Sequence, residues 1–331
     1  MALNFDDLAS TTFKNYRKSF TDNIMKKIAL YAYMKKKGMI ERKKGGLTLV
    51  EPLMYGLNGT FGSYSGYDVL PNTPQKGMTA AEYQWKNLSE AITISKEEED
   101  INAGESRILN LLKAKIQQAE KTYTLNFNQM LFGDGSGNSG KDVAGLQAYV
   151  KSAPNTSTTV GGIDPSTYTW WQNQVPTGSN PVATFVTNGL GLTNMRSVYN
   201  LCCREGDQPD VIITTRELFE AYESLMTTIE RINFSKGSPL AGDLGFETLT
   251  FKGKTMFWDY HCQDIAGVGK PMYFLNTDYL KLIVDSDTDF DMTDWRVPVN
   301  QMAKTAYILF RGQLICNNRL TQGMIAFTSA A

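Results

Sequence analysis

The most informative stretch of the chain is residues 84–131, QWKNLSEAITISKEEEDINAGESRILNLLKAKIQQAEKTYTLNFNQML. Apolar and polar side chains alternate at its beginning, which predicts a strand over Gln84–Ser95. The remainder keeps apolar side chains at intervals of three and four residues, which predicts one helix over about 96–132. Ser95 is the expected N-cap, and the carboxylates after it complement the helix dipole. At about 1.5 Å per residue this helix would be roughly 50 Å long, which is unusual for a globular protein.

A long two-stranded ribbon is predicted before the helix. A strand at Leu47–Leu53 and the strand at Gln84–Ser95 flank a segment that is rich in glycine and aromatic residues. This segment would leave strand edges and aromatic side chains exposed if nothing covered it, so we expect a neighbouring chain to cover it. The residues expected at that contact between subunits are Tyr64, Tyr67, Lys76 and Trp85.

The N-terminal part of the chain carries an excess of positive charge. Residues 1–50 contain eleven Lys/Arg and four Asp/Glu, a net charge of +7, which leaves 22 Lys/Arg against 30 Asp/Glu in the rest. Apolar side chains recur at helical spacing from Phe13 to Tyr31, with lysines between them. We expect either a packing helix with a solvated basic face, or a helix that docks on an acidic partner, a polyanion or a membrane surface.

The part of the chain after the long helix is predicted to be a mixed α/β region. A Gly-rich stop at Gly133–Gly140 is followed by a connector rich in Thr, Ser and Pro over 152–181. Thr214 and Glu217 fit a capping box that opens a helix after a short buried strand. The other expected elements are a helix over 192–202, strands at 211–214, 272–275, 280–284 and 305–316, and a hairpin over 249–258.

The composition excludes several classes of protein. The chain has 331 residues, of which 42% are hydrophobic and 20% charged, and is long enough for two domains or one elaborate domain. Its single histidine, His261, excludes multi-histidine metal sites. Four cysteines, two of them adjacent, are too few for a disulfide framework and favour a reducing compartment. The acidic N-terminus and the lack of an apolar run of about 18 residues predict neither a signal peptide nor a membrane span.

The chemical motifs of the sequence do not favour an enzyme. Gly135–Gly140 matches a dinucleotide fingerprint but follows a helix, so a flexible joint is favoured. Asp285–Asp291 resembles a calcium loop without its turn glycine and final glutamate, so a solvated acidic loop is favoured over a metal site. His261 and Cys262 would point to opposite faces of a strand, which favours a structural histidine. We predict no enzymatic activity, no cofactor and no metal site.

The order of the predicted parts resembles the major capsid proteins of tailed bacteriophages, which share the HK-ninety-seven-like fold. The stretches Tyr273–Leu282 and Val299–Ala306, the latter leading into Phe310–Leu314, are also similar to C-terminal stretches of these coat proteins. The resemblance implies an α+β fold. Its implied parts are an N-terminal arm (1–44), an extended loop or E-loop ribbon (45–95), a peripheral domain with a long spine helix (96–181), an α/β axial domain (182–298) and C-terminal strands that return to the core (299–331).

The function implied by this resemblance is a capsid protein that assembles as hexamers and pentamers into an icosahedral head around double-stranded DNA. The implied partners are other copies of the chain, a separate scaffolding protein, portal and decoration proteins, and packaged DNA bound without sequence specificity, but no membrane. The implied location is the virion, after assembly in the host bacterial cytoplasm. Two alternatives remain: an encapsulin-like nanocompartment shell with the same fold, and an enzyme that uses His261 and Cys262.

Overall fold

The computed structural model describes residues 29–101, 105–177, 180–186, 189–229 and 249–330. The predicted basic helix lies outside these residues up to position 28. The described helices are α2 (Ala29–Lys36), α3 (Lys96–Ile101), α4 (Glu105–Phe132), α5 (Gly137–Gly140), α6 (Leu146–Tyr149), α7 (Leu190–Cys202), α8 (Arg216–Ile229) and the 3₁₀ turns η1 (Thr169–Trp171) and η3 (Thr277–Tyr279). The described strands are β1 (Ile40–Lys43), β2 (Thr48–Met54), β3 (Met78–Gln84), β4 (Lys86–Ser95), β5 (Val182–Thr184), β6 (Val211–Thr214), β7 (Leu249–Phe251), β8 (Lys254–Trp258), β9 (Lys270–Leu275), β10 (Leu280–Asp285), β11 (Asp291–Met292), β12 (Ala303–Cys316) and β13 (Gly323–Ser329).

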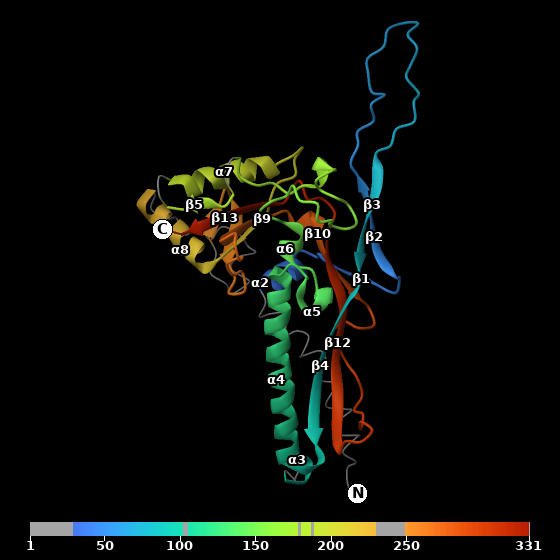
Figure 1. Cartoon of the computed structure of the whole chain (residues 1–331), viewed down its shortest axis with the longest axis vertical. Coiled ribbons are helices and arrows are strands. Elements are labelled where there is room, and N and C mark those ends of the chain that lie inside the picture. Colours follow the sequence, from blue (N-terminus) through green and yellow to red (C-terminus); the bar gives the residue numbers. More distant parts are fainter. Residues whose placement is uncertain (1–28, 102–104, 178–179, 187–188, 230–248, 331) are drawn as a thin grey trace.

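A five-stranded sheet is built around the long strand β12. The main order of the sheet is β1-β10-β12-β11, and β4 also pairs with β12. The β4 pairing is antiparallel from Ala303↔Ser95 to Gly312↔Lys86, after which β12 continues in antiparallel pairing with β10. Helix α4 runs beside β4 and β12 along the length of the lower part of the molecule (Figure 1).

The ribbon differs from the prediction in its second strand. It pairs β2 with β3, from Thr48↔Gln84 to Met54↔Met78, so the ribbon strand expected at Gln84–Ser95 is wrong. Residues 86–95 form β4 and pair with β12 instead. The change of partner occurs at Trp85, which separates the two strands. The buried positions are odd-numbered in β3 (Ala81 and Tyr83) and even-numbered in β4 (Ile92 and Ile94), so the alternation shifts by one residue at the point where the partner changes.

A six-stranded mixed sheet forms the other part of the molecule. Its order is β5-β13-β9-β6-β8-β7, and every residue of β6 is buried, as its apolar run predicts. Helix α7 packs against β13 and β9, and α8 packs against β8. The cap of α8 lies one residue later than predicted, because Thr215 Oγ1 accepts the N–H of Leu218 (3.5 Å). Thr214 belongs to β6, and its hydroxyl donates to the carbonyl of Pro271 (3.3 Å).

Helix α4 contributes an aromatic cluster to the core. The apolar stripe predicted along the helix is buried at Ile116 and at the following stripe positions through Leu131, apart from the half-buried Met130. Phe127, which is 1% exposed, lies at the centre of the cluster. Its ring centroid is 5.1 Å from that of Phe310, 5.8 Å from that of Phe290 and 6.0 Å from that of Tyr31. The helix therefore shares one core with α2, β12 and the segment before β11.

The N-cap predicted at Ser95 is confirmed, and Glu98 completes a capping box. The N–H of Glu98 donates to Ser95 Oγ (3.2 Å), and the N–H of Ser95 donates to Glu98 Oε2 (3.0 Å). Lys115 Nζ of α4 lies 2.7 Å from the same carboxylate oxygen. The hydrogen bond from Lys115, followed by the one from Ser95, holds the pKa of Glu98 below its usual value. These contacts satisfy backbone donors where the chain passes from β4 into α3.

Glu90 makes the stability of the contact between β4 and α4 depend on pH. It lines a cavity of about 340 Å³ together with Tyr123 and other residues of the two elements, and burial raises its pKa to about 7. Its contribution to stability is present below its unfolded pKa and is lost as the pH rises through about 7. We therefore expect Glu90→Gln to raise the melting temperature at pH 8, and to raise it much less at pH 5. Equal shifts at both pH values in thermal unfolding would contradict this, and Glu82→Gln on the exposed face of β3 is the matched control.

Candidate interaction surfaces

The base of the ribbon is fixed to its own subunit. β2 and β3 both alternate exposed and buried side chains, and the inward residues include Leu49, Leu53 and Tyr83. The Tyr83 hydroxyl donates to the carbonyl of Cys316 at the end of β12 (2.6 Å), and burial raises the pKa of this hydroxyl. The buried face and this hydrogen bond hold the ribbon to the five-stranded sheet.

The Thr/Ser/Pro-rich connector also supports the ribbon base, a role that its composition does not indicate. Gly161 has a φ of +59°, and a Cβ at this position would lie 3.0 Å from Ala81 Cβ and 3.0 Å from Tyr83 Cζ. The glycine thus permits both the backbone conformation and the close approach. Trp170 stacks on Tyr55 at the start of the tip, with ring centroids 4.8 Å apart and an interplanar angle of 11°.

The other face of the ribbon and its tip expose apolar side chains. Val50, Met54 and Met78 are exposed on the ribbon, and Met54 pairs directly with Met78. The tip loop, residues 55–77, projects away from the rest of the chain (Figure 1), and residues 61–76 are all exposed. Its large exposed apolar side chains are Tyr55, Leu57, Phe61, Tyr64, Tyr67, Val69 and Leu70. We call these side chains, together with Val50, Met54 and Met78, the tip surface.

The structure separates the four residues predicted at a contact between subunits. Tyr64 is 68% exposed, Tyr67 is fully exposed, and Lys76 is exposed on the same loop. Trp85 is half-buried against the core of its own subunit, and the Arg311 guanidinium lies 4.7 Å from its ring centroid. The first three residues are accessible to a neighbouring chain, whereas much of Trp85 is already covered.

A second exposed apolar group lies at the opposite end of the molecule. The loop between β11 and β12 carries Val297, Val299 and Met302, which are 65%, 89% and 79% exposed. We call these three residues the far-end patch, because β12 begins at the end of the molecule that is remote from the tip loop (Figure 1). The patch has no hydrophobic period and was not predicted. The two apolar surfaces therefore lie at opposite ends of the subunit (Figure 1).

The acidic loop predicted over 285–291 is neutralised by ion pairs. The pairs are Arg42 with Asp289 (2.6 Å), Lys44 with Asp287 (2.9 Å) and Arg311 with Asp285 (3.2 Å). Asp285, Asp287 and Asp289 therefore each have their own cation, and together the pairs join β1 and β12 to this loop. Within the described ranges, no group of three or more His, Cys, Asp or Glu could hold a metal ion.

His261 and Cys262 lie beside a polar contact with α4. The backbone N–H of His261 donates to Asp259 Oδ1 (2.8 Å), which also accepts from Asn128 of α4 (3.0 Å). Cys262 is buried, and burial raises the pKa of its thiol well above the usual value, so this thiol is a poor nucleophile.

In the part of the chain that the structure describes, no helix is long and apolar enough to cross a membrane.

Comparison with known proteins identifies the fold through structure. No protein-family model matches the sequence, and no curated protein matches it. The structure is similar to a chain of the Cyanophage A-1(L) capsid asymmetric unit, with a TM-score of 0.65 and 17% identity over 87% of this chain and 89% of that chain. It is also similar to chains from the capsid of the native GTA particle (TM-score 0.58, 12% identity, 89% of each chain) and from the capsid of Myoviridae Phage XM1 (TM-score 0.54, 13% identity, 88% and 90%).

These similarities cover nearly the whole chain and establish its fold. The chain has the α+β, HK-ninety-seven-like fold of phage capsid subunits, as the order of its sequence features predicts. At identities of 17% or lower, residue roles do not transfer from these chains.

Proposed function

We propose that this chain is the major capsid protein of a tailed bacteriophage, and that many copies assemble as hexamers and pentamers into an icosahedral head around double-stranded DNA. The observation that carries the proposal is a firmly anchored ribbon with an uncovered apolar tip, in a chain with a phage capsid fold. The similar structures come from capsids of phages and of a GTA particle, which does not favour the encapsulin-like alternative.

The proposed contact joins the tip surface of one copy to the far-end patch of the next. The tip loop has only two charged residues, Asp68 and Lys76, so its large apolar side chains can be buried at little electrostatic cost. A contact between different surfaces of identical chains is heterologous, and it generates rings when the rotation between copies closes. Hexamers and pentamers are two such closed rings.

The proposed domain division follows the order of elements. We propose five parts: the N-terminal arm (1–44), the extended ribbon (from 45), the peripheral domain with the spine helix (to 181), the axial domain (182–298) and the C-terminal strands (299–331). We assign β4 to the peripheral domain, because its partner is β12 and not the ribbon. In this division the tip and the far-end patch belong to different parts of the subunit.

The proposed partners follow from the charge distribution along the chain and from its proposed place in a capsid shell. The acidic body would repel packaged DNA, whereas the basic arm could contact a scaffolding protein, a neighbouring copy or DNA without sequence specificity. We infer that portal and decoration proteins also contact the shell, that the protein resides in the virion, and that the shell forms in the host bacterial cytoplasm. The proposed role requires no enzymatic activity.

The direct test of this function is the state of the purified full chain. Sedimentation velocity and negative-stain electron microscopy should detect rings or closed shells that become more abundant as the protein concentration rises. A compact monomer at all accessible concentrations, with or without a crowding agent, would contradict the proposal.

A further inference from the structure

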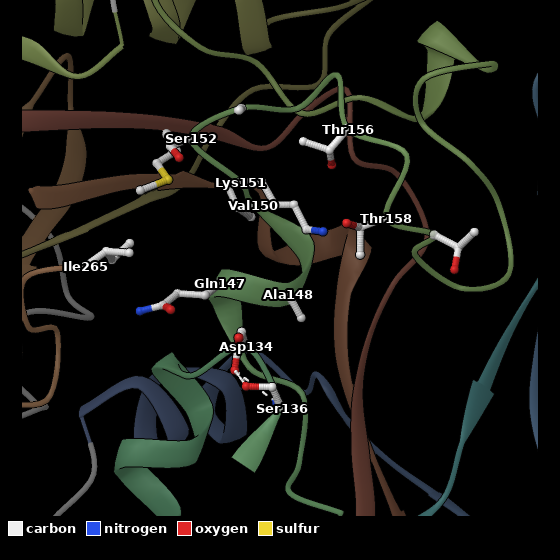
Figure 2. Close-up of a pocket in the computed structure, with 14 residues that line it drawn as sticks. Asp134, Ser136, Gln147, Ala148, Val150, Lys151, Ser152, Thr156, Thr158 and Ile265 are labelled. Atoms are coloured by element: carbon white, nitrogen blue, oxygen red, sulfur yellow. Dashed lines mark hydrogen bonds between the residues drawn. The ribbon is translucent and has the colours of Figure 1, made fainter. Parts of the chain in front are cut away.

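A cavity of about 550 Å³ lies away from both apolar surfaces, between the end of α4, helix α6 and the loop that follows Lys151. Figure 2 shows the Lys151 side chain ending inside this cavity, which Thr158 also lines. Asp134 and Ser136 form the opposite wall. Lys151 is half-buried, and its ammonium group forms no ion pair within the described ranges.

A second cation lies behind this cavity. Arg319 is 0% exposed and donates to three uncharged acceptors: the carbonyls of Tyr149 (2.7 Å) and Trp171 (2.8 Å) and the Asn173 side chain (3.2 Å). No carboxylate pairs with its guanidinium among the residues that the structure describes. A buried charge is normally paired, so the region behind the cavity has an excess of positive charge.

Asn173 connects the two cations. Its Oδ1 accepts from both Arg319 and the backbone N–H of Lys151 (3.0 Å), and its Nδ2 donates to the carbonyl of Lys151 (2.8 Å). Because Asn173 is itself buried, the backbone of Lys151 is held in place beside the Arg319 guanidinium. The ammonium group is therefore presented to the cavity by a fixed backbone.

The electrostatics of Lys151 agree with this geometry. Burial, followed by the Arg319 charge, lowers the pKa of the Lys151 ammonium, and Asp134 opposes that effect. The Asp134 carboxylate accepts from the N–H of Ser136 (2.9 Å) and from its Oγ (2.7 Å), so it is largely satisfied by its own loop. Lys151 is thus influenced by one carboxylate and one other cation, and a bound anion would relieve the repulsion between the two cations.

Hydroxyl groups complete the cavity. Ser152, Thr156, Thr158 and Thr159 line it, and Thr156 Oγ1 is buried without a hydrogen-bond partner. A buried hydroxyl without a partner costs free energy, which a ligand acceptor would recover. Several hydrogen-bond donors that surround one ammonium group match a ligand with several acceptor oxygens better than they match a halide ion.

We propose that this cavity binds a small phosphate-type oxyanion, either free phosphate or the phosphate of a small phosphomonoester, with Lys151 as the cationic contact and Thr156 as a hydroxyl donor. The cavity volume leaves room for a small group attached to the phosphate. The site does not depend on assembly, because all the residues that form it come from one chain.

The test is isothermal titration calorimetry of the purified full chain with inorganic phosphate, at constant ionic strength set with chloride. Saturable binding is expected, with an affinity at least about tenfold weaker in Lys151→Gln, because a charge-assisted contact is lost. Lys151→Arg should retain most of the affinity, and Thr156→Val should weaken it several-fold. Lys141→Gln, an exposed lysine shortly before α6 in sequence, should leave it unchanged.

A parallel titration with glycerol 3-phosphate separates the two sources of the ligand group. If glycerol 3-phosphate binds more tightly than inorganic phosphate, the ligand of the cavity is a phosphomonoester. If it binds more weakly, the ligand is free phosphate. The proposal is overturned if the wild-type chain shows no saturable binding of either probe, or if Lys151→Gln binds them as tightly as the wild type. Melting curves without ligand establish that each variant is folded.

Discussion

Replacing four side chains of the tip loop by serine should abolish self-association and leave the fold of the subunit intact. The variant combines Leu57→Ser, Phe61→Ser, Tyr64→Ser and Tyr67→Ser, all at exposed positions. Burial of each large apolar side chain stabilises by about 1.5–3 kcal/mol, so losing four costs roughly 6 kcal/mol or more at each contact. That corresponds to a loss of roughly 10⁴-fold or more in the association constant.

The same variant should unfold like the wild-type monomer, because exposed substitutions usually change stability by only about ±0.5 kcal/mol. Tyr260→Ser is the matched control, since Tyr260 is similarly exposed but belongs to neither the tip surface nor the far-end patch. Sedimentation velocity measures association, and thermal unfolding measures the fold. If the fourfold variant still formed the wild-type assembly, the tip surface would not be the contact.

Phe127→Ala should strongly destabilise the subunit, because it removes the ring at the centre of the aromatic cluster. The ring contacts four other aromatic rings, including those of Phe290 and Phe310, and is almost completely buried. Removing a buried phenylalanine ring typically costs about 3–5 kcal/mol, because the surrounding core cannot collapse fully into the space. The melting temperature should fall by roughly 5–15 °C.

This measurement is best made in the fourfold tip variant, so that assembly does not add to the apparent stability. Leu125→Ala is the control on the same helix, because Leu125 is 55% exposed and should change the free energy of unfolding by less than about 1 kcal/mol. Equal losses in the two variants would mean that α4 does not pack through its predicted stripe.

Much of the fold could be predicted because the responsible residues are close in sequence. The stripe along α4, the cap at Ser95, the buried strand β6 and the hairpin of β7 and β8 all follow from local spacing or turn chemistry. Strand β3 was missed because its inward positions include the small Ala81, which adds little to an apolar pattern. The Gly-rich segment after α4 contains the short helix α5, and Gly135 and Gly140 have positive φ, whereas the flexibility expected of this joint stays a prediction.

The candidate sites were harder to predict because they depend on contacts between distant segments. Tyr64 and Tyr67 could be predicted as contact residues, because they are aromatic residues in a loop that has no hydrophobic period. The support of the ribbon by Gly161 and Trp170 depends on tertiary packing, which no local pattern records. The burial of Arg319 is similarly invisible in sequence, since arginine is normally exposed.

The central claim is that identical chains associate through the tip of one copy and the far end of the next. Cryo-electron microscopy of the assembled full chain tests it most directly, at a resolution that traces the tip loop. We predict closed shells or rings in which residues 55–77 cover a neighbouring copy near Val297, Val299 and Met302. An assembly in which the tip loop lies free in solvent, or folds back on its own subunit, would contradict the account.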